Sequence, residues 1–464
     1  MINYFYTEMA AAFPSYAASP NESMADELSS TSVIEEGGLP SWFAVTDLAV
    51  ASIATAGLML ARLASKNGGN LPSRTVDRRL ASFWFKTTLR PVGWTLPPIW
   101  NAVSGNYLTQ DGWIRLHTNV SAHRAAALSV LGASEDREAV AKAVAGWSGV
   151  ALMDAIVEAG GCAAAMNNID EWRHHPQGAA VAQEPLIQWV EHETGNHSTQ
   201  PLDQARPLAG IRILDLTRIL AGPISTRFLA AYGADVLRID PPGWDEPANI
   251  PEVVLGKRCA GLDLRQEEDQ ATFTKLLQGA DVLVHGYRHG ALAGLGFDAE
   301  ARRTINPNLI DVSLNAYGWT GPWTMRRGFD SLVQMNSGIA DFGMKQERSD
   351  TPFPLPAQAL DHATGYLMAA AVLCALERRH VAGIVTSARL SLARTAAMLI
   401  PTHSSKKSEA MSPETAADLA PAIEKSAWGD AQRIRFPLKV EGIDAKWPHP
   451  AGKLRTAEPA WQQV

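Results

Sequence analysis

The sequence is poor in cysteine, and its few cysteines follow no pattern that binds a metal. Its 464 residues include three, at Cys162, Cys259 and Cys374. An odd number at scattered positions predicts neither a disulfide framework nor a zinc site. His174 and His175 are adjacent but lack Cys or His partners at zinc spacing, so we interpret them as a surface pair. We therefore expect no metal, and a reducing compartment such as the cytoplasm.

Charge of one sign and long hydrophobic runs are also scarce. The net charge is −7 without any basic block, which argues against a nucleic-acid partner. The first residues show no basic region before an apolar run, so no signal peptide is expected. Val45 to Leu63 is the one membrane-like window, but it contains Asp47 and Arg62 among many Ala, Ser and Thr residues. We expect a buried helix there and no membrane partner.

The order of patterns along the chain indicates several domains. The length is too great for one small core. The Asp111-Gly112 pair predicts a hairpin, and helical patterns follow at 121–131, 135–147 and 149–158. The expected divisions are a flexible arm (1–37), a first helix and crossover (38–103), a small α+β domain (104–180), a linker (181–206), a large domain (207–400) and a C-terminal return segment (401–464) with a late strand pair at 433–442.

The large domain alternates between strand and helix patterns. Strands are expected at 211–216, 235–240, 281–286 and 309–315, with helical segments between them. This alternation predicts an α/β fold, a doubly wound Rossmann-like parallel sheet. Ligands of such sheets lie beyond the carboxyl ends of the strands, where the loop Thr217 to Pro223 is expected. That loop reads TRILAGP and lacks G-x-G-x-x-G, so an NAD-dependent dehydrogenase is a disfavoured alternative.

Basic residues gather near the same edge of the expected sheet. They are Arg218, Arg238, Lys257, Arg258 and Arg288. Guanidinium and ammonium groups bind phosphates through charge-assisted hydrogen bonds, so this set could hold a phosphorylated ligand. Each of them could equally be a solvated surface charge.

Two Ala-rich apolar helices, at 42–62 and 357–377, each carry an aspartate near the start. These residues are Asp47 and Asp361. An aspartate in a first turn can simply cap backbone N–H groups and complement the helix dipole. The alternative is that the carboxylate is held ionised and aimed at an electrophile. The pattern alone leaves both interpretations open.

Six segments in order resemble the family III CoA-transferases of the CaiB/BaiF type, the group of formyl-CoA transferase, carnitine CoA-transferase and the α-methylacyl-CoA racemases. The segments are PLAGIRILDLTRILAGPISTRFLAAYGADVLRIDPPG from Pro207, GKRCAGLDL from Gly256, ADVLVHGYRHGALAGLGF from Ala280, NPNLIDVSLNAYGWTGPW from Asn306, RRGFDSLVQMNSGIA from Arg326, and the Asp361 helix. No single segment would suffice, but six in family order make a specific match.

The resemblance implies an acyl-CoA:carboxylate CoA-transferase in which Asp361 is the nucleophile. Its carboxylate would attack an acyl-CoA thioester and form an aspartyl mixed anhydride, with CoA passing to a small carboxylic acid. The helix N-terminus is expected to keep that carboxylate ionised against burial. Coenzyme A is then a substrate, and no bound cofactor is implied. The family's CoA site corresponds to Arg218, Ile219, Leu220, Ala221, Arg238, Lys257, Arg258, Tyr287 and Arg288.

One position separates the two activities of the family. Its racemases carry a histidine before the aspartate of the motif that reads GFD here, and this chain has Phe329. Without that histidine the usual two-base proton exchange lacks a partner for the helix aspartate. CoA transfer is therefore favoured over racemisation.

The first half of the chain resembles parts of the same family. Residues 106–178 are similar to its small domain, and the Asp47 helix is similar to the Asp361 helix. If the chain contains a repeat, Asp47 corresponds to Asp361 at an offset of 314 (361 minus 47), and Arg79 corresponds to Arg389 at an offset of 310 (389 minus 79). The two copies would then differ in length by four residues, and we place this difference at 67–70. Similar composition could explain two Ala-rich helices, but the family order favours a repeat.

The chain thus resembles two fused incomplete copies of the family. The first copy lacks the α/β half and the second lacks the small domain. Either Asp361 or Asp47 could then be the nucleophile, with Asp361 favoured because it follows its own α/β half. A catalytically silent CoA-binding paralogue is the alternative function. A homodimer is expected, although the interlocked dimer of the family does not follow.

Overall fold

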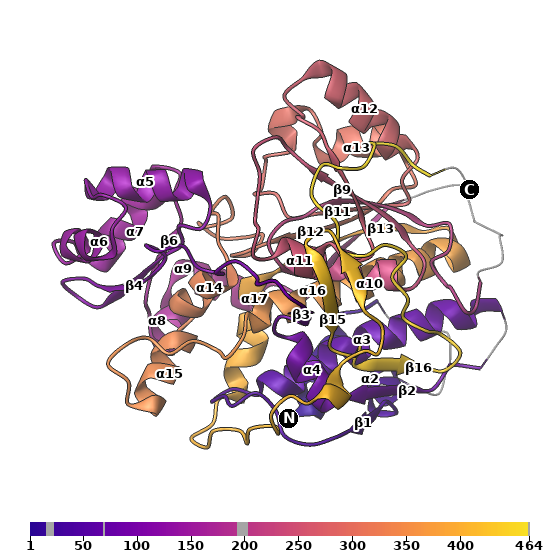
Figure 1. Ribbon diagram of the computed structural model, residues 1–464, viewed down its shortest axis with the longest axis horizontal. Coiled ribbons are helices and arrows are strands. Elements are labelled where there is room, and N and C mark those ends of the chain that lie inside the picture. The colour runs from indigo at the N-terminus through magenta and orange to yellow at the C-terminus, as the bar shows by residue number, and fades with distance from the viewer. Residues whose placement is uncertain (15–22, 68–69, 193–202, 463–464) are drawn as a thin grey trace.

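A seven-stranded sheet organises the computed structural model, which describes residues 1–14, 23–67, 70–192 and 203–462 (Figure 1). The strand order is β10-β9-β8-β11-β12-β13-β7. The first six strands run parallel, and β7 is antiparallel to β13. The bounds are β7 Gln188–His192, β8 Arg212–Leu216, β9 Asp235–Asp240, β10 Arg258–Gly261, β11 Val282–His285, β12 Ile310–Asn315 and β13 Val385–Ser391. The predicted Rossmann-like α/β fold is confirmed, and the strand order reverses between β8 and β11.

Helices cover both faces of the sheet because its strands are apolar on both sides. In β8, Ile213 packs into the core shared with α10 (Ala221–Ala231) and α16 (Ala359–Ala382), whereas Leu214 packs toward α12 (Glu267–Gln278). The second face also carries α13 (Ala299–Ile305), and the short α11 (Ile250–Val253) follows β9. Burial on both faces explains why the strands read as apolar runs rather than alternating ones.

The helix α3 (Val45–Ala64) lies against α16, on the side away from the sheet (Figure 1). Both helices are long and apolar enough to cross a membrane, but 94% and 100% of their apolar windows are buried inside the protein. The expected buried helix at Val45 to Leu63 is therefore present, and α16 shares its character. The two aspartate helices form the centre of the molecule.

The surroundings of α3 repeat those of α16. The order α3, β2 (Arg74–Asp77), α4 (Arg78–Trp84) matches α16, β13, α17 (Leu392–Leu399). The helix starts differ by 314 in both cases (359 minus 45, 392 minus 78). The capping residues Asp77 and Ser391 also differ by 314 (391 minus 77). The pairing of Arg79 with Arg389 at an offset of 310 is therefore wrong, and no four-residue difference is needed.

Return strands are exchanged between the two halves of this repeat. β2 lies between the parallel β1 (Ser32–Ile34) and the antiparallel β16 (Leu438–Val440). β13 lies in the same way between the parallel β12 and the antiparallel β7. Because β7 precedes the α/β half and β16 follows it, each half is completed by a strand from the other end of the chain.

Three segments differ from their sequence-based expectations. Residues 1–37, expected as a flexible arm, contain α1 (Ile2–Ala11) and α2 (Met24–Ser29), and residues 15–22 lie outside the described part. Phe5 and Met9 of α1 are fully buried because they pack into the core around α3. The expected linker 181–206 supplies β7, with 193–202 outside the described residues. The late strands do not pair with each other, since β15 (Gly429–Arg433) joins β14 (Glu424–Ser426) and β3 (Leu89–Pro91).

A small α+β unit lies apart from the large sheet, at the left of Figure 1. Its sheet contains β4 (Gly105–Leu108), β5 (Trp113–Leu116) and β6 (Ala163–Ala165), and β4 and β5 form the hairpin predicted at Asp111-Gly112. Its helices are α5 (Ser121–Leu131), α6 (Arg137–Val144) and α7 (Gly149–Glu158), close to the predicted ranges. The helices α8 (Ile169–His174), α9 (Pro176–Ala182), α14 (Asp330–Asn336) and α15 (Ile339–Glu347) lie between this unit and α17.

Candidate active site

The loop after β8 is fixed by a buried carboxylate. Asp215 accepts hydrogen bonds from the Thr217 N–H (2.9 Å), the Thr226 hydroxyl (2.6 Å) and the Lys257 ammonium (2.9 Å). Ile219, two residues after Thr217, has a φ of 65°, a conformation that β-branched residues rarely adopt. Its N–H donates to Glu246 (2.7 Å), and this bond helps to hold the unusual backbone.

Two glycines allow close packing at this loop, and Gly365 is the one that brings α16 onto it. A Cβ at Gly222 would lie 2.3 Å from the Thr217 side chain, and one at Gly365 would lie 2.4 Å from the carbonyl oxygen of Ala221. Only glycine allows such close approach of two backbones. Asp361 is one helical turn before Gly365 on α16, so this contact places its carboxyl beside the start of α10.

A cavity of about 290 Å³ opens where these elements meet. Asp361 lines it, together with Arg218, Ile219 and Ala221 of the loop and with Tyr287 and Arg288 after β11. This is the carboxyl edge of the sheet at the point where the strand order reverses. The structure therefore brings together six of the residues predicted from the sequence. Leu220 is the one residue of the predicted loop set 218–221 that does not line the cavity.

The remaining predicted cations do not reach this cavity. Arg238 is fully buried and pairs with Asp240 (2.8 Å) and Glu246 (2.5 Å). Burial opposes its charge, but those two carboxylates keep the pKa of Arg238 above its ordinary value. Lys257 is held by Asp215, and Arg258 pairs with Asp235 (3.0 Å). Carboxylates inside the protein neutralise these three cations, as burial requires for Arg238 and Lys257, so none of the three is free at the cavity. Their role as ligands of CoA stays a prediction.

Asp47 is also absent from the cavity lining. It forms an ion pair with Arg78 of α4 at 2.5 Å. Asp361 lines the cavity and Asp47 does not, which favours Asp361 of the two candidate nucleophiles. Asp47 has the role of a paired carboxylate near the start of α3.

Asp361 does not cap its own helix, contrary to one interpretation of the sequence. Asp330 of α14 accepts the backbone N–H of Asp361 at 2.9 Å and also the amide of Gln334 at 2.5 Å. The side-chain oxygen of Gln334 in turn accepts a hydrogen bond from the N–H of Leu355 at 2.7 Å, which fixes the orientation of the amide. Asp330 therefore takes the position at the positive end of α16 that the sequence suggested for Asp361.

The two carboxyl groups share one buried environment. Burial raises the pKa of Asp361 well above its ordinary value, and the charge of Asp330 raises it further. Burial likewise raises the pKa of Asp330 to about 6, although hydrogen bonds from Gln334 and from the N–H groups of Asp361 and Leu360 oppose that change. Because Asp330 receives these donors and Asp361 does not, the carboxylate form of Asp330 is the better stabilised of the two, and Asp361 is the harder one to ionise. The expected effect of the helix end on Asp361 is therefore opposed by burial and by the charge of Asp330, both of which raise the pKa of Asp361.

The other wall of the cavity holds residues that the sequence did not identify as ligands. His123 of α5, Arg326, Arg327 and Phe329 line it. His117 stacks on Phe329 with ring centroids 3.8 Å apart. Burial lowers the pKa of His123 to about 4, so its imidazole is neutral near pH 7. Arg326, Arg327 and Phe329 lie in the motif that begins at Arg326, but the sequence does not show that it faces the cavity, and no motif marks His123 of the small unit.

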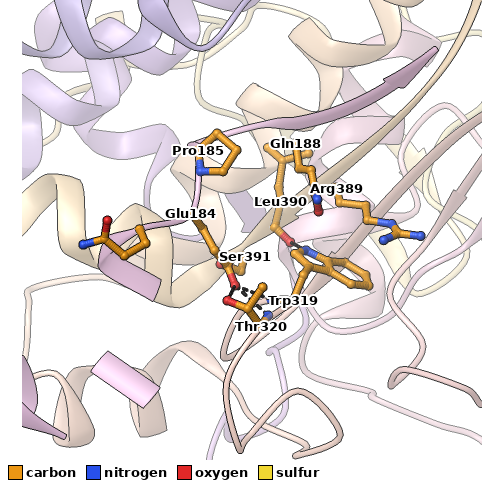
Figure 2. A pocket seen from close by; sticks show the side chains of 9 residues that line it. Glu184, Pro185, Gln188, Trp319, Thr320, Arg389, Leu390 and Ser391 are labelled. Carbon is orange, nitrogen blue, oxygen red and sulfur yellow. Dashed lines mark hydrogen bonds between the residues drawn. The ribbon is translucent and has the colours of Figure 1, made fainter. Parts of the chain in front are cut away.

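A second cavity lies at the edge where β7 joins the sheet, and none of the predicted site residues lines it (Figure 2). Glu184 accepts hydrogen bonds there from the N–H groups of Trp319 and Thr320, both at 2.7 Å. Arg389 lies over the Trp319 ring at 5.2 Å from its centroid. These contacts attach the start of β7 to the loop after β12.

Comparisons with known proteins agree with this geometry. Residues 208–424 match the family described as CoA-transferase family III. The probable fatty acyl-CoA transferase Rv3272 of Mycobacterium tuberculosis is 34% identical over 206 residues, which are 41% of this chain and 52% of the relative. The acetyl-CoA:oxalate CoA-transferase of Acetobacter aceti is 35% identical over 30% of this chain and 39% of the relative.

Two solved structures match part of the chain. The crystal structure of Rv3272 is 33% identical over 41% of this chain and 55% of that chain, with a TM-score of 0.39. A CAIB/BAIF family protein from Brucella suis is 26% identical over 49% and 65%, with a TM-score of 0.38. The chain spans about half or less of the length of the two curated relatives named above. Residues 208–424 of the chain are therefore similar to CoA-transferase family III.

Proposed function

We propose that this protein transfers CoA between an acyl-CoA thioester and a small carboxylic acid, with Asp361 as the nucleophile. The observation that supports this most directly is that Asp361 shares one cavity with Arg218 and Arg288 at the reversal point of the sheet. The family match covers the same residues. The curated relatives that carry transferase names support the reaction class without fixing the acids.

The first step uses the carboxylate of Asp361. One of its oxygens attacks the thioester carbonyl, the carbon–sulfur bond breaks, and CoA leaves as a thiolate while an aspartyl mixed anhydride remains. The thiolate then attacks the aspartyl carbonyl of the anhydride, which releases the donor acid as a carboxylate and leaves an aspartyl-CoA thioester. The acceptor carboxylate attacks this thioester and displaces the CoA thiolate, so a second mixed anhydride forms. Attack of the thiolate on the acceptor's carbonyl carbon gives the new acyl-CoA and frees the carboxylate of Asp361. Asp361 must first lose its proton, because only the ionised carboxyl is a nucleophile.

Arg218 is prepared to hold the anionic part of CoA. Its guanidinium stacks on Trp244 and Tyr287 at 4.5 and 4.8 Å from the ring centroids, and it donates to the Tyr287 hydroxyl at 2.7 Å. Arg288 has no carboxylate partner among the described residues, and it is exposed at the cavity. Two arginines with free donors suit a diphosphate.

Trapping of the intermediate tests the proposal. The protein is incubated with a panel of acyl-CoAs, treated with hydroxylamine or borohydride, and digested for peptide mass analysis. We expect an adduct at Asp361 in the wild type and in Asp47→Asn, and none in Asp361→Asn. Measurable CoA binding without an adduct from any thioester would instead support the silent CoA-binding paralogue.

A racemase is a second candidate, because His123 supplies an imidazole to the cavity despite Phe329. A neutral histidine and a protonated aspartate could exchange the α-proton of a 2-methylacyl-CoA. In heavy water, a racemase would introduce deuterium at that carbon without forming an Asp361 adduct, and His123→Gln would abolish the uptake. That result would favour this candidate. We expect adduct formation without such uptake.

A further inference from the structure

The charged residues that line the cavity are unbalanced. Arg218, Arg288, Arg326 and Arg327 are cations, and Asp361 is the one carboxyl among the lining residues. Because burial and Asp330 raise the pKa of Asp361, that carboxyl offsets little of the positive charge. The cavity therefore favours a ligand with more than one negative group.

These four cations come from two separate walls. Arg218 and Arg288 follow β8 and β11 at the edge of the large sheet, where the preceding section places the anionic part of CoA. Arg326 and Arg327 lie in the loop that leads into α14 and contact the small unit. Arg327 donates to the carbonyl oxygen of Gly160 at 3.0 Å. The second pair of arginines therefore lies on a different wall of the cavity from the pair proposed to hold the diphosphate of CoA.

The second pair is incompletely neutralised. Arg326 lies over the Trp323 ring (4.1 Å) and pairs with Asp154 at 3.3 Å, but the Asp154 side chain is 64% exposed, so this ion pair is weak. Arg327 is partly buried and has no carboxylate partner among the described residues. A guanidinium in this setting binds a carboxylate well, since its planar fork matches both oxygens.

Arg327 is also close to the nucleophile along the chain. It precedes Asp330 by three residues, and the Asp330 side chain accepts the N–H of Asp361. Three residues span at most roughly 10 Å. An acid that reacts at Asp361 can therefore reach Arg327 with its far end if it is short.

We propose that the acids exchanged by this protein carry a second carboxylate at the far end, and that Arg327, with Arg326 beside it, binds that group. The proposal rests on the CoA-transferase function and adds the substrate class: short dicarboxylic acids rather than monocarboxylic ones. Arg327 would act by selecting the acid, while Asp361 carries out the chemistry.

The test compares acceptors of equal length with one and two carboxylates. Succinate is compared with butyrate and glutarate with pentanoate, in the wild type, Arg327→Gln, Arg327→Lys and the control Arg173→Gln. Arg173 is an exposed arginine of α8 paired with Asp170, outside the cavity. In Arg327→Gln we expect KM for the diacids to rise about tenfold, the value of one charge-assisted contact, with KM for the monoacids unchanged. Arg327→Lys should recover part of the loss, and Arg173→Gln should match the wild type.

The outcomes separate the two proposals. If no thioester labels Asp361, the transferase function fails. If Asp361 is labelled but Arg327→Gln changes KM for diacids and monoacids alike, or the wild type prefers monoacids, the dicarboxylate proposal fails and the function stands. Circular dichroism and thermal unfolding of each variant exclude misfolding as the cause.

Discussion

Asp361 combines a buried position with a like-charged neighbour, which makes its carboxyl hard to ionise. A group whose folded-state pKa is raised stabilises the fold below its unfolded pKa and loses that contribution as pH rises through the folded pKa. The nucleophile is thus reactive under the conditions in which it destabilises the fold. This is the usual opposition between stability and activity at a catalytic group.

The first prediction concerns Asp361→Asn. The variant should give no acyl adduct, and its Tm at pH 8 should exceed that of the wild type, because the uncharged amide avoids the cost of a buried carboxylate. At pH 4, where Asp361 is protonated, the two Tm values should converge. Thermal unfolding at both pH values measures this, and a lower Tm of the variant at pH 8 would contradict it.

The second prediction concerns Asp330→Asn. Removing the neighbouring charge lowers the pKa of Asp361, so the acidic limb of the rate of adduct formation should move to lower pH. In the variant an NH2 group replaces one acceptor oxygen, so at least one of the hydrogen bonds that Asp330 accepts is lost, and the variant should be less stable by about 1–3 kcal/mol. A purely structural role of Asp330 would lower stability without moving the limb.

The sequence identified some residues of the site and could not identify others. Asp361 and Arg218 could be found because motifs in family order mark them. Asp330 lies within the motif RRGFDSLVQMNSGIA. Its hydrogen bond to the N–H of Asp361 joins residues 31 positions apart, so only the folded structure reveals it. Arg238 and Lys257 looked like ligands because a sequence does not show which charges pair internally.

At the scale of elements, the site depends on the contact between α10 and α16. That contact has no room for a side chain at Gly365, whose Cβ would meet the backbone of Ala221 and, at 3.0 Å, Ile224. The alternation of strands and helices predicted both elements. Their close approach could not be predicted, because a glycine inside an Ala-rich helix gives no sign of what lies opposite.

The third prediction uses this contact. Gly365→Ala should lower the free energy of unfolding by about 1–3 kcal/mol, because overpacking outweighs the helix propensity that alanine adds. It should also reduce adduct formation, since Asp361 shifts with α16. Gly57→Ala on α3 is the matched control: its Cβ would meet the Leu438 side chain at 2.7 Å, which can move more easily than backbone. Equal losses in urea unfolding of both variants would contradict the argument.

At the scale of the whole molecule, the exchange of β7 and β16 ties the two ends of the chain together. The sequence indicated two incomplete copies, but it could not show the strand exchange, because that depends on which sheet each return strand joins. A buried network makes the same connection: Glu252 of α11 accepts from Thr88 near β3 (2.7 Å), pairs with Arg227 of α10 (2.5 Å) and pairs with Arg433 of β15 (3.4 Å). We therefore expect the described elements to unfold together.

Glu252 gives the last prediction, on acid stability. Burial opposes its charge, but Arg227, Arg433 and Thr88 lower the pKa of Glu252 to about 2 from 4.5. A depressed carboxyl pKa stabilises the fold above the unfolded value, and this stability is lost as pH falls from about 4.5 to about 2. Glu252→Gln should cost about 3–5 kcal/mol at pH 7, because it leaves the buried Arg227 without its carboxylate partner and removes one of the two carboxylates that pair with Arg433. Its stability should then fall less than that of the wild type between pH 5 and pH 2.5, as measured by urea unfolding at each pH. Parallel pH curves for the two proteins would show that Glu252 does not hold the ends of the chain together through its charge.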